Sequence, residues 1–135
     1  MAKPKMYIDT EEELLKLAKE WQSKLFLNDW LIGFSLATCR EMSCIDWAGE
    51  SDAQYVNRCG TVMLLRKEDM PENMLIKQPM ELVLIHELLH FKFVTFETNT
   101  IEGYYWNEKQ HQLLEDIAKS LYMAKYNLDL EWFRL

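Results

Sequence analysis

The chain lacks several features of secreted and membrane proteins. Its three cysteines are odd in number, and no CxxC pair occurs that would indicate a cysteine-based zinc site. No apolar stretch approaches the roughly 20 residues of a membrane span. The opening segment runs into acidic residues where a signal peptide would be apolar. We therefore expect a cytoplasmic protein that has free thiols and makes no contact with a membrane.

Positive charge is also scarce. The net charge is −7, and no cluster of five or more basic residues occurs, which argues against nucleic acid as a ligand. The chain contains neither repeats nor low-complexity segments, and its hydrophobic share of 49% is typical of a folded globule. A length of 135 residues indicates one domain over residues 1–135.

The spacing of apolar residues predicts an α+β fold. A capping box at 10–13 begins the first helix, and Pro79 suits the first turn of another. Gly60 indicates a bulge or bend within a strand-forming region. The predicted elements, in chain order, are a helix over 10–27, a strand over 30–37, a candidate strand over 38–45, one or two strands over 54–66, a loop over 66–78, a helix over 80–95, a looser stretch over 96–105 and a helix over 105–126.

The segment 83–95 reads VLIHELLHFKFVT, an apolar run interrupted by two histidines and a glutamate. Burying three such polar groups costs free energy unless they have partners. His86 and His90 are four residues apart, so both imidazoles can lie on one face of a helix and bind one ion, such as Zn²⁺. The alternative is a pair of core histidines satisfied by hydrogen bonds, with Glu87 paired to one of them.

Glu87 has the position of a general base. It follows the first histidine of the HExxH motif and can reach a water on the metal without binding the metal itself. It would take a proton from that water and later hand it to the leaving amine. Zinc lowers the pKa of a bound water toward about 7, so hydroxide is available at neutral pH. The motif therefore predicts hydrolysis assisted by a metal.

A catalytic zinc site needs a third protein ligand and an open position. The last predicted helix carries Glu108, His111 and Glu115 on one face. If His111 is the ligand, Glu115 can accept a hydrogen bond from a ligand imidazole. If Glu115 is the ligand, His111 is a neighbour that polarises the site. Glu108 also fits a solvated stripe of charges on an amphipathic helix.

These residues resemble the small zincin-type metallopeptidases, including minimal single-domain, gluzincin-like proteins of bacterial phages and mobile elements. HELLHFKF, followed by a helix with acidic residues, carries the resemblance, and the segments WLIGFSL and GTVMLL fit more weakly. The resemblance implies a zinc-dependent peptidase acting on a peptide or protein substrate. It also implies that the strand preceding the active-site helix forms the edge against which an extended substrate pairs.

The resemblance also bears on the third ligand. In the gluzincin branch this ligand is a Glu, and an acidic residue four positions later supports a ligand histidine. Laid onto QHQLLEDIAKSL, the pattern places His111 at the ligand position, where the family has Glu, and Glu115 at the supporting position. The metzincin signature HExxHxxGxxH is absent, because Phe93 and Phe96 occupy its glycine and third histidine positions.

We therefore expect a zinc-dependent hydrolase. The predicted roles are base for Glu87, Zn²⁺ ligands for His86, His90 and His111, and supporting residue or alternative ligand for Glu115. Two further side chains, Tyr104 and Tyr105, are candidates for stabilising an oxyanion, although with Trp106 they also fit a role in the core. The alternative function is a non-catalytic zinc-binding regulatory or protein-interaction module, which has no use for a base at position 87.

Overall fold

The part of the chain that the structure describes contains both helices and β-strands. This computed structural model describes residues 3–44, 47–71, 77–94 and 101–134, with the backbone alone over 101–106. The predicted α+β class is confirmed. The elements are α1 (Glu11–Lys24), β1 (Leu31–Ala37), β2 (Gly49–Gln54), β3 (Cys59–Leu65), a 3-10 turn η1 (Lys67–Asp69), α2 (Met80–Phe93), α3 (Ile101–Tyr126) and a 3-10 turn η3 (Leu130–Phe133).

The first helix begins where the capping box predicts. The Thr10 hydroxyl accepts a hydrogen bond from the Glu13 backbone N–H at 3.1 Å. The Glu13 carboxylate reaches back one residue further than in the usual box, to the N–H of Asp9 at 3.0 Å. The helix ends at Lys24, three residues before the predicted end, and Phe26 then adopts a left-handed backbone conformation with φ of 56°.

The sheet is mixed and has the order β1-β3-β2. β3 pairs in parallel with β1 and antiparallel with β2. The candidate strand over 38–45 is wrong, because residues 38–44 form turns and the second strand lies later, in GESDAQ. The expectation for the substrate edge also needs correction. The strand preceding α2 is β3, which is central and paired on both sides, so the edge strand nearest α2 is β2.

Gly60 has a different role from the predicted bulge or bend. The pairing register runs without interruption through this residue, which lies opposite Ile32 on one side and Ala53 on the other. A Cβ atom at position 60 would lie 2.2 Å from the Asp52 carbonyl oxygen and 2.6 Å from the Phe91 ring. Glycine is therefore required because α2 and the sheet approach each other closely here.

Substituting Gly60 should destabilise the fold. We expect Gly60→Ala to lower the free energy of unfolding by about 2–3 kcal/mol, because the new methyl group meets backbone that cannot move aside. The matched control is Gly33→Ala on β1, where the added Cβ would lie 3.9 Å from its nearest neighbour, a Thr61 methyl group. Urea unfolding of both variants measures the difference. Equal unfolding midpoints would contradict the steric role of Gly60.

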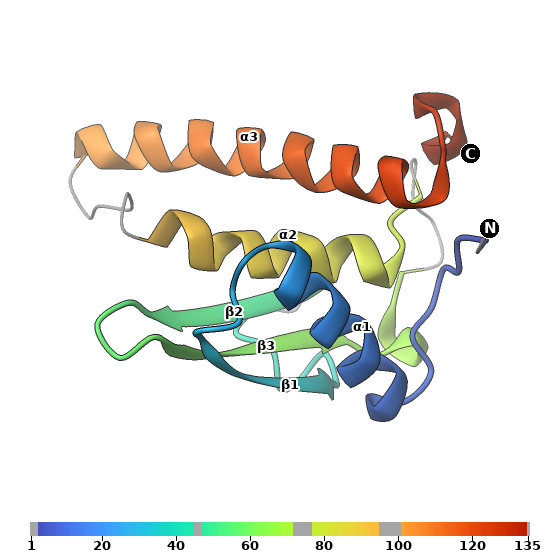
Figure 1. The fold of residues 1–135 in the computed structure, drawn as a ribbon, viewed down its shortest axis with the longest axis horizontal. Coiled ribbons are helices and arrows are strands. Elements are labelled where there is room, and N and C mark those ends of the chain that lie inside the picture. The colour runs from blue at the N-terminus through green and yellow to red at the C-terminus, as the bar shows by residue number, and fades with distance from the viewer. Residues whose placement is uncertain (1–2, 45–46, 72–76, 95–100, 135) are drawn as a thin grey trace.

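Helix α2, which carries the HExxH motif, lies between the sheet and α3 (Figure 1). Helix α1 contacts both β1 and α2. Helix α2 is central, as predicted: each of its residues is buried except His86, His90, Lys92 and Phe93. Pro79 is its N-cap. α3 ends at Tyr126 as predicted but begins at Ile101, four residues early. None of the described helices is long and apolar enough to cross a membrane.

A buried carboxylate joins the three helices. Glu81 on α2 is only 3% exposed. Its Oε2 accepts hydrogen bonds from Trp21 Nε1 at 2.7 Å and from Lys125 Nζ at 2.6 Å, and its Oε1 accepts one from the Tyr126 hydroxyl. A buried charge is tolerated when it is paired and hydrogen-bonded in this way. The cluster fixes α2 relative to α1 and α3, and so fixes the frame from which His86 projects.

Candidate metal centre

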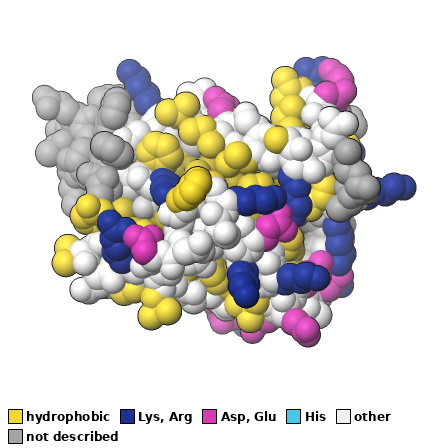
Figure 2. All heavy atoms as spheres, in the orientation of Figure 1, with side chains coloured by type: hydrophobic (Ala, Val, Ile, Leu, Met, Phe, Trp, Pro, Cys, Tyr) yellow, Lys and Arg dark blue, Asp and Glu magenta, His cyan; other side chains and the backbone are white. Residues whose placement is uncertain are grey.

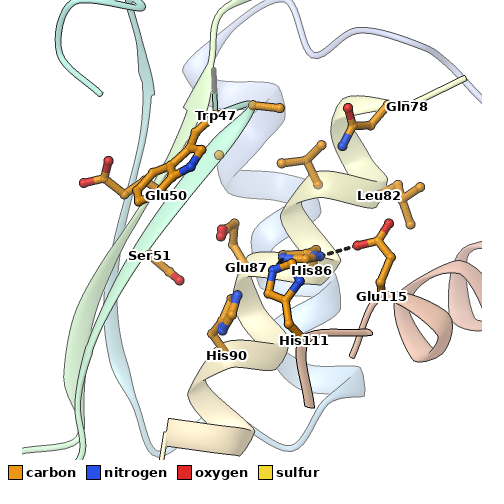
Figure 3. A pocket seen from close by; sticks show the side chains of 13 residues that line it. Trp47, Glu50, Ser51, Gln78, Leu82, His86, Glu87, His90, His111 and Glu115 are labelled. Atoms are coloured by element: carbon orange, nitrogen blue, oxygen red, sulfur yellow. Dashed lines mark hydrogen bonds and ion pairs between the residues drawn. The ribbon is translucent and has the colours of Figure 1, made fainter. Parts of the chain in front are cut away.

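The histidines lie in a cavity of about 630 Å³ bounded by β2, α2 and α3 (Figure 3). This volume is within the usual range for small-molecule and cofactor sites. No histidine is visible on the face of the molecule shown in Figure 2. Its lining residues are Trp47, Ala48, Gly49, Glu50, Ser51, Gln78, Leu82, Val83, His86, Glu87, His90, His111 and Glu115.

Three imidazoles converge in this cavity. His86 and His90 project from α2 and His111 from α3, and one ring nitrogen from each lies within 4.8 Å of the others. The Nε2 atoms of His86 and His111 are 3.1 Å apart. Ligands at about 2.0–2.1 Å from a tetrahedral zinc ion are separated from one another by roughly 3.3 Å. The three side chains therefore form a group that could hold a metal ion.

Glu115 orients one member of this group. Its Oε2 accepts a hydrogen bond from Nδ1 of His86, as the dashed line in Figure 3 marks. A neutral imidazole that donates through Nδ1 carries its lone pair on Nε2. That nitrogen is the one nearest His111, so the hydrogen bond selects the tautomer that a metal requires. Glu115 itself is not a member of the converging ligand group.

The other two histidines are held in the neutral form. Burial, together with the neighbouring His86 and His111, lowers the pKa of His90 to about 4. Burial and His86 likewise lower the pKa of His111. A histidine must be unprotonated to bind a metal, so these environments favour the ligand form at neutral pH. The hydrogen bond from His86 and the positive charge of Lys119 lower the pKa of Glu115, which keeps that carboxyl ionised.

Glu87 lies beside the histidines, and one of its carboxylate oxygens is buried without a hydrogen-bond partner among the described residues. The residue is 5% exposed, and the oxygen concerned is Oε2. Burial raises the pKa of Glu87 to about 7, and a hydrogen bond with the Ser51 hydroxyl opposes the rise only in part. A buried, unpartnered carboxylate oxygen is costly and indicates a ligand or a reacting group. A carboxyl with this pKa can both take up and release a proton near neutral pH.

β2 closes the other side of the cavity. A Cβ atom on Gly49 would lie 2.6 Å from Val83 Cγ1 and 3.1 Å from Glu87 Cγ, so glycine lets the strand approach α2. The Ser51 side chain points from the strand toward Glu87 and His90 (Figure 3). Sequence reasoning missed Trp47, Gly49 and Ser51, because it assigned no strand to their segment. A glycine before a polar segment is too weak a signal to identify them.

The remaining predicted residues lie apart from the ligand group or outside the described part. Glu108 is exposed on α3 and does not join the three histidines. Tyr104, Tyr105 and Trp106 fall within the backbone of α3, but their side chains lie outside the described residues, so their predicted roles stay predictions.

The comparisons with known proteins add no relative. No family model, curated protein or solved structure matches the chain. The function of this cavity therefore has to be argued from its side chains.

Proposed function

We propose that this protein is a zinc-dependent hydrolase, and specifically a peptidase of the HExxH type. The observation that carries the proposal is the combination of three converging imidazoles with a buried, unpartnered carboxylate oxygen in one open cavity. Three protein ligands with an open position are typical of catalytic zinc sites, whereas structural zinc sites have four protein ligands. A purely structural site also has no use for the unpartnered oxygen of Glu87.

The proposed ligands are His86, His90 and His111. Three neutral imidazoles suit Zn²⁺ better than they suit Mg²⁺ or Ca²⁺, which prefer oxygen ligands. When bound, zinc would polarise the substrate carbonyl and lower the pKa of a water molecule toward about 7. Glu115 supports the site by accepting a hydrogen bond from the Nδ1–H of His86, which holds this ring in its orientation and tautomer.

Glu87 moves the proton in the proposed reaction. As the water oxygen attacks the carbonyl carbon, its proton passes to the carboxylate of Glu87, where Oε2 is unpartnered. When the carbon–nitrogen bond breaks, Glu87 passes the proton to the leaving amine. The two transfers leave Glu87 as it began, so one carboxyl group acts first as base and then as acid.

β2 offers a place for an extended substrate. It is an edge strand that lines the cavity, and within the described residues its outer edge pairs with no other strand. A peptide can add to such an edge through main-chain hydrogen bonds, which give affinity without depending on its side chains. We propose that the substrate pairs here, so that its carbonyl lies near Glu87 and the three histidines.

Substitution of the base tests this proposal. Glu87→Gln should retain zinc and the melting temperature of the wild type while lowering hydrolysis of a peptide library by about 10²–10⁴-fold, because it removes a proton acceptor that does not bind the metal. Elemental analysis and mass spectrometry of the digests provide the measurements.

Two comparisons make this test specific. Glu108→Gln on the exposed face of α3 is the matched control and should leave hydrolysis unchanged. If Glu87→Gln loses zinc as severely as His86→Ala does, Glu87 is a ligand and not a base. If the zinc-loaded wild type cleaves no peptide in the library, the non-catalytic zinc-binding module becomes the better description.

A further inference from the structure

The charges around the cavity bear on which part of a peptide it can bind. The chain has 15 Lys and Arg residues, all of them among the described residues, and none lines the cavity. An enzyme that removes residues from the C-terminus needs a cation to bind the terminal carboxylate, and Arg is the usual choice. No Lys or Arg lines this cavity, so it offers no such side chain to a C-terminal carboxylate.

Among the described residues that line the cavity, no carboxylate is available to an N-terminus either. Glu115 is engaged with His86. Both oxygens of Glu50 are bound by Ser43, through the backbone N–H at 2.7 Å and the hydroxyl at 2.9 Å. The carboxylate of Glu50 also points away from the histidines (Figure 3). Of the carboxylates on the described lining residues, Glu87 alone remains, and the proposed reaction uses it as the base. The cavity therefore suits a segment within a chain better than either end.

Apolar side chains line the cavity from two elements, α2 and the segment before β2. Leu82 and Val83 lie one helical turn before His86 and Glu87, so they share the face of α2 that bounds the cavity. Trp47 lines the same cavity just before β2 and keeps 48% of its surface exposed. A large aromatic side chain left half exposed beside a cavity can bury further apolar surface when a ligand arrives.

We propose that the cavity binds an internal segment of a peptide chain and seats one large apolar side chain against Trp47, Leu82 and Val83, next to the bond that is cleaved. This inference rests on the proposed peptidase function and adds its substrate class. Trp47 is then a residue that determines specificity. Glu87 and the histidines act at the bond itself, whereas Trp47 contacts the neighbouring side chain of the substrate.

The first experiment digests a library of octapeptides, acetylated and amidated at their ends, with the zinc-loaded protein. We expect blocked and free peptides to be cut equally fast, at internal bonds beside Leu, Phe, Ile or Met. A peptide pair with Phe or Asp beside the preferred bond then gives a ratio of kcat/KM values. Trp47→Ala should lower this ratio by about tenfold, since it removes apolar contact with the substrate side chain. Trp47→Phe should retain most of it.

The control is Val56→Ala, which alters a residue that is 91% exposed and does not line the cavity. This variant should keep the wild-type ratio. Zinc content and melting temperature of all three variants show whether any loss arises from misfolding. Release of single residues from free ends, or equal cleavage beside Phe and Asp, would overturn the inference and leave the hydrolase proposal intact.

A binding measurement tests the proposed apolar subsite independently of the hydrolysis reaction. Calorimetry with the blocked peptide pair on zinc-loaded Glu87→Gln protein needs no turnover. Tighter binding of the Phe peptide, lost on adding Trp47→Ala, would support the inference even if the wild type cleaves nothing, and the hydrolase proposal would then fail alone. If the wild type cleaves no peptide, no cleavage site is known from which to design the peptide pair. The pair is then designed from library peptides that bind to the zinc-loaded Glu87→Gln protein. If it captures no peptide and the wild type cleaves none, both proposals are overturned.

Discussion

Removing the metal with a chelator should lower the melting temperature of this protein by about 10 °C or more. The proposed ligands come from α2 and α3, so an ion would cross-link two helices whose packing otherwise rests on side-chain contacts. A ligand present at about 1,000 times its Kd stabilises the folded state by about 4 kcal/mol. For a chain of this size each kcal/mol corresponds to roughly 3–5 °C.

The measurement is thermal unfolding followed by circular dichroism, with and without chelator, alongside elemental analysis. We expect about one zinc per chain before chelation. His90→Ala is the matched control: it should melt at the chelated temperature from the start, and chelator should not lower it further. Protein that is purified without metal and melts at the same temperature in chelator would rule out the metal centre.

The part of the site that the sequence predicts best comes from one helix. His86, Glu87 and His90 belong to a single helical turn, so their relative positions follow from helix geometry once the helix is recognised. The apolar run around them indicated that the helix is central, and its burial agrees. His111 lies on another element, and its approach to His86 depends on how α3 packs against α2. Spacing alone therefore left the choice between His111 and Glu115 open.

The second strand was not predictable from local preferences. Four of the six residues of GESDAQ (Gly, Glu, Asp and Ala) are of types depleted in strands, and the segment contains no β-branched or aromatic side chain. The segment becomes a strand because β3 offers it an antiparallel partner from Gly49 to Gln54. Its polar composition is consistent with its place at the edge of the sheet. The same fact explains why one wall of the cavity, with Ser51 and Trp47, was missed.

Contacts distant in sequence account for the other differences. Glu81 appears in the sequence as an ordinary acidic residue in the first turn of a helix. Its burial depends on Trp21, 60 positions earlier, and Lys125, 44 positions later. Gly60 similarly meets Phe91 across the interface between the sheet and α2. Neither pairing has a signature within a short window, because each follows from the relative placement of whole elements.

The third ligand gives the sharpest test, because His111→Ala and Glu115→Ala should behave very differently. His111 belongs to the converging group, and its loss removes one of three protein bonds to the metal. We expect that variant to retain no stoichiometric zinc after dialysis. The hydrogen bond that joins Glu115 to the group runs from Nδ1 of His86. Loss of such a supporting residue typically weakens metal affinity by 10–100-fold and leaves the site detectable.

Competitive titration with a zinc indicator ranks the variants, with Glu108→Ala as the control on the same helix. Glu108 is exposed and outside the ligand group, so its variant should bind zinc with wild-type affinity. Wild-type affinity in His111→Ala, together with complete loss in Glu115→Ala, would reverse the assignment and make the carboxylate the ligand. An intermediate result for Glu115→Ala would show that its carboxylate acts through the His86 ring, since without it that ring loses the partner that fixes its tautomer.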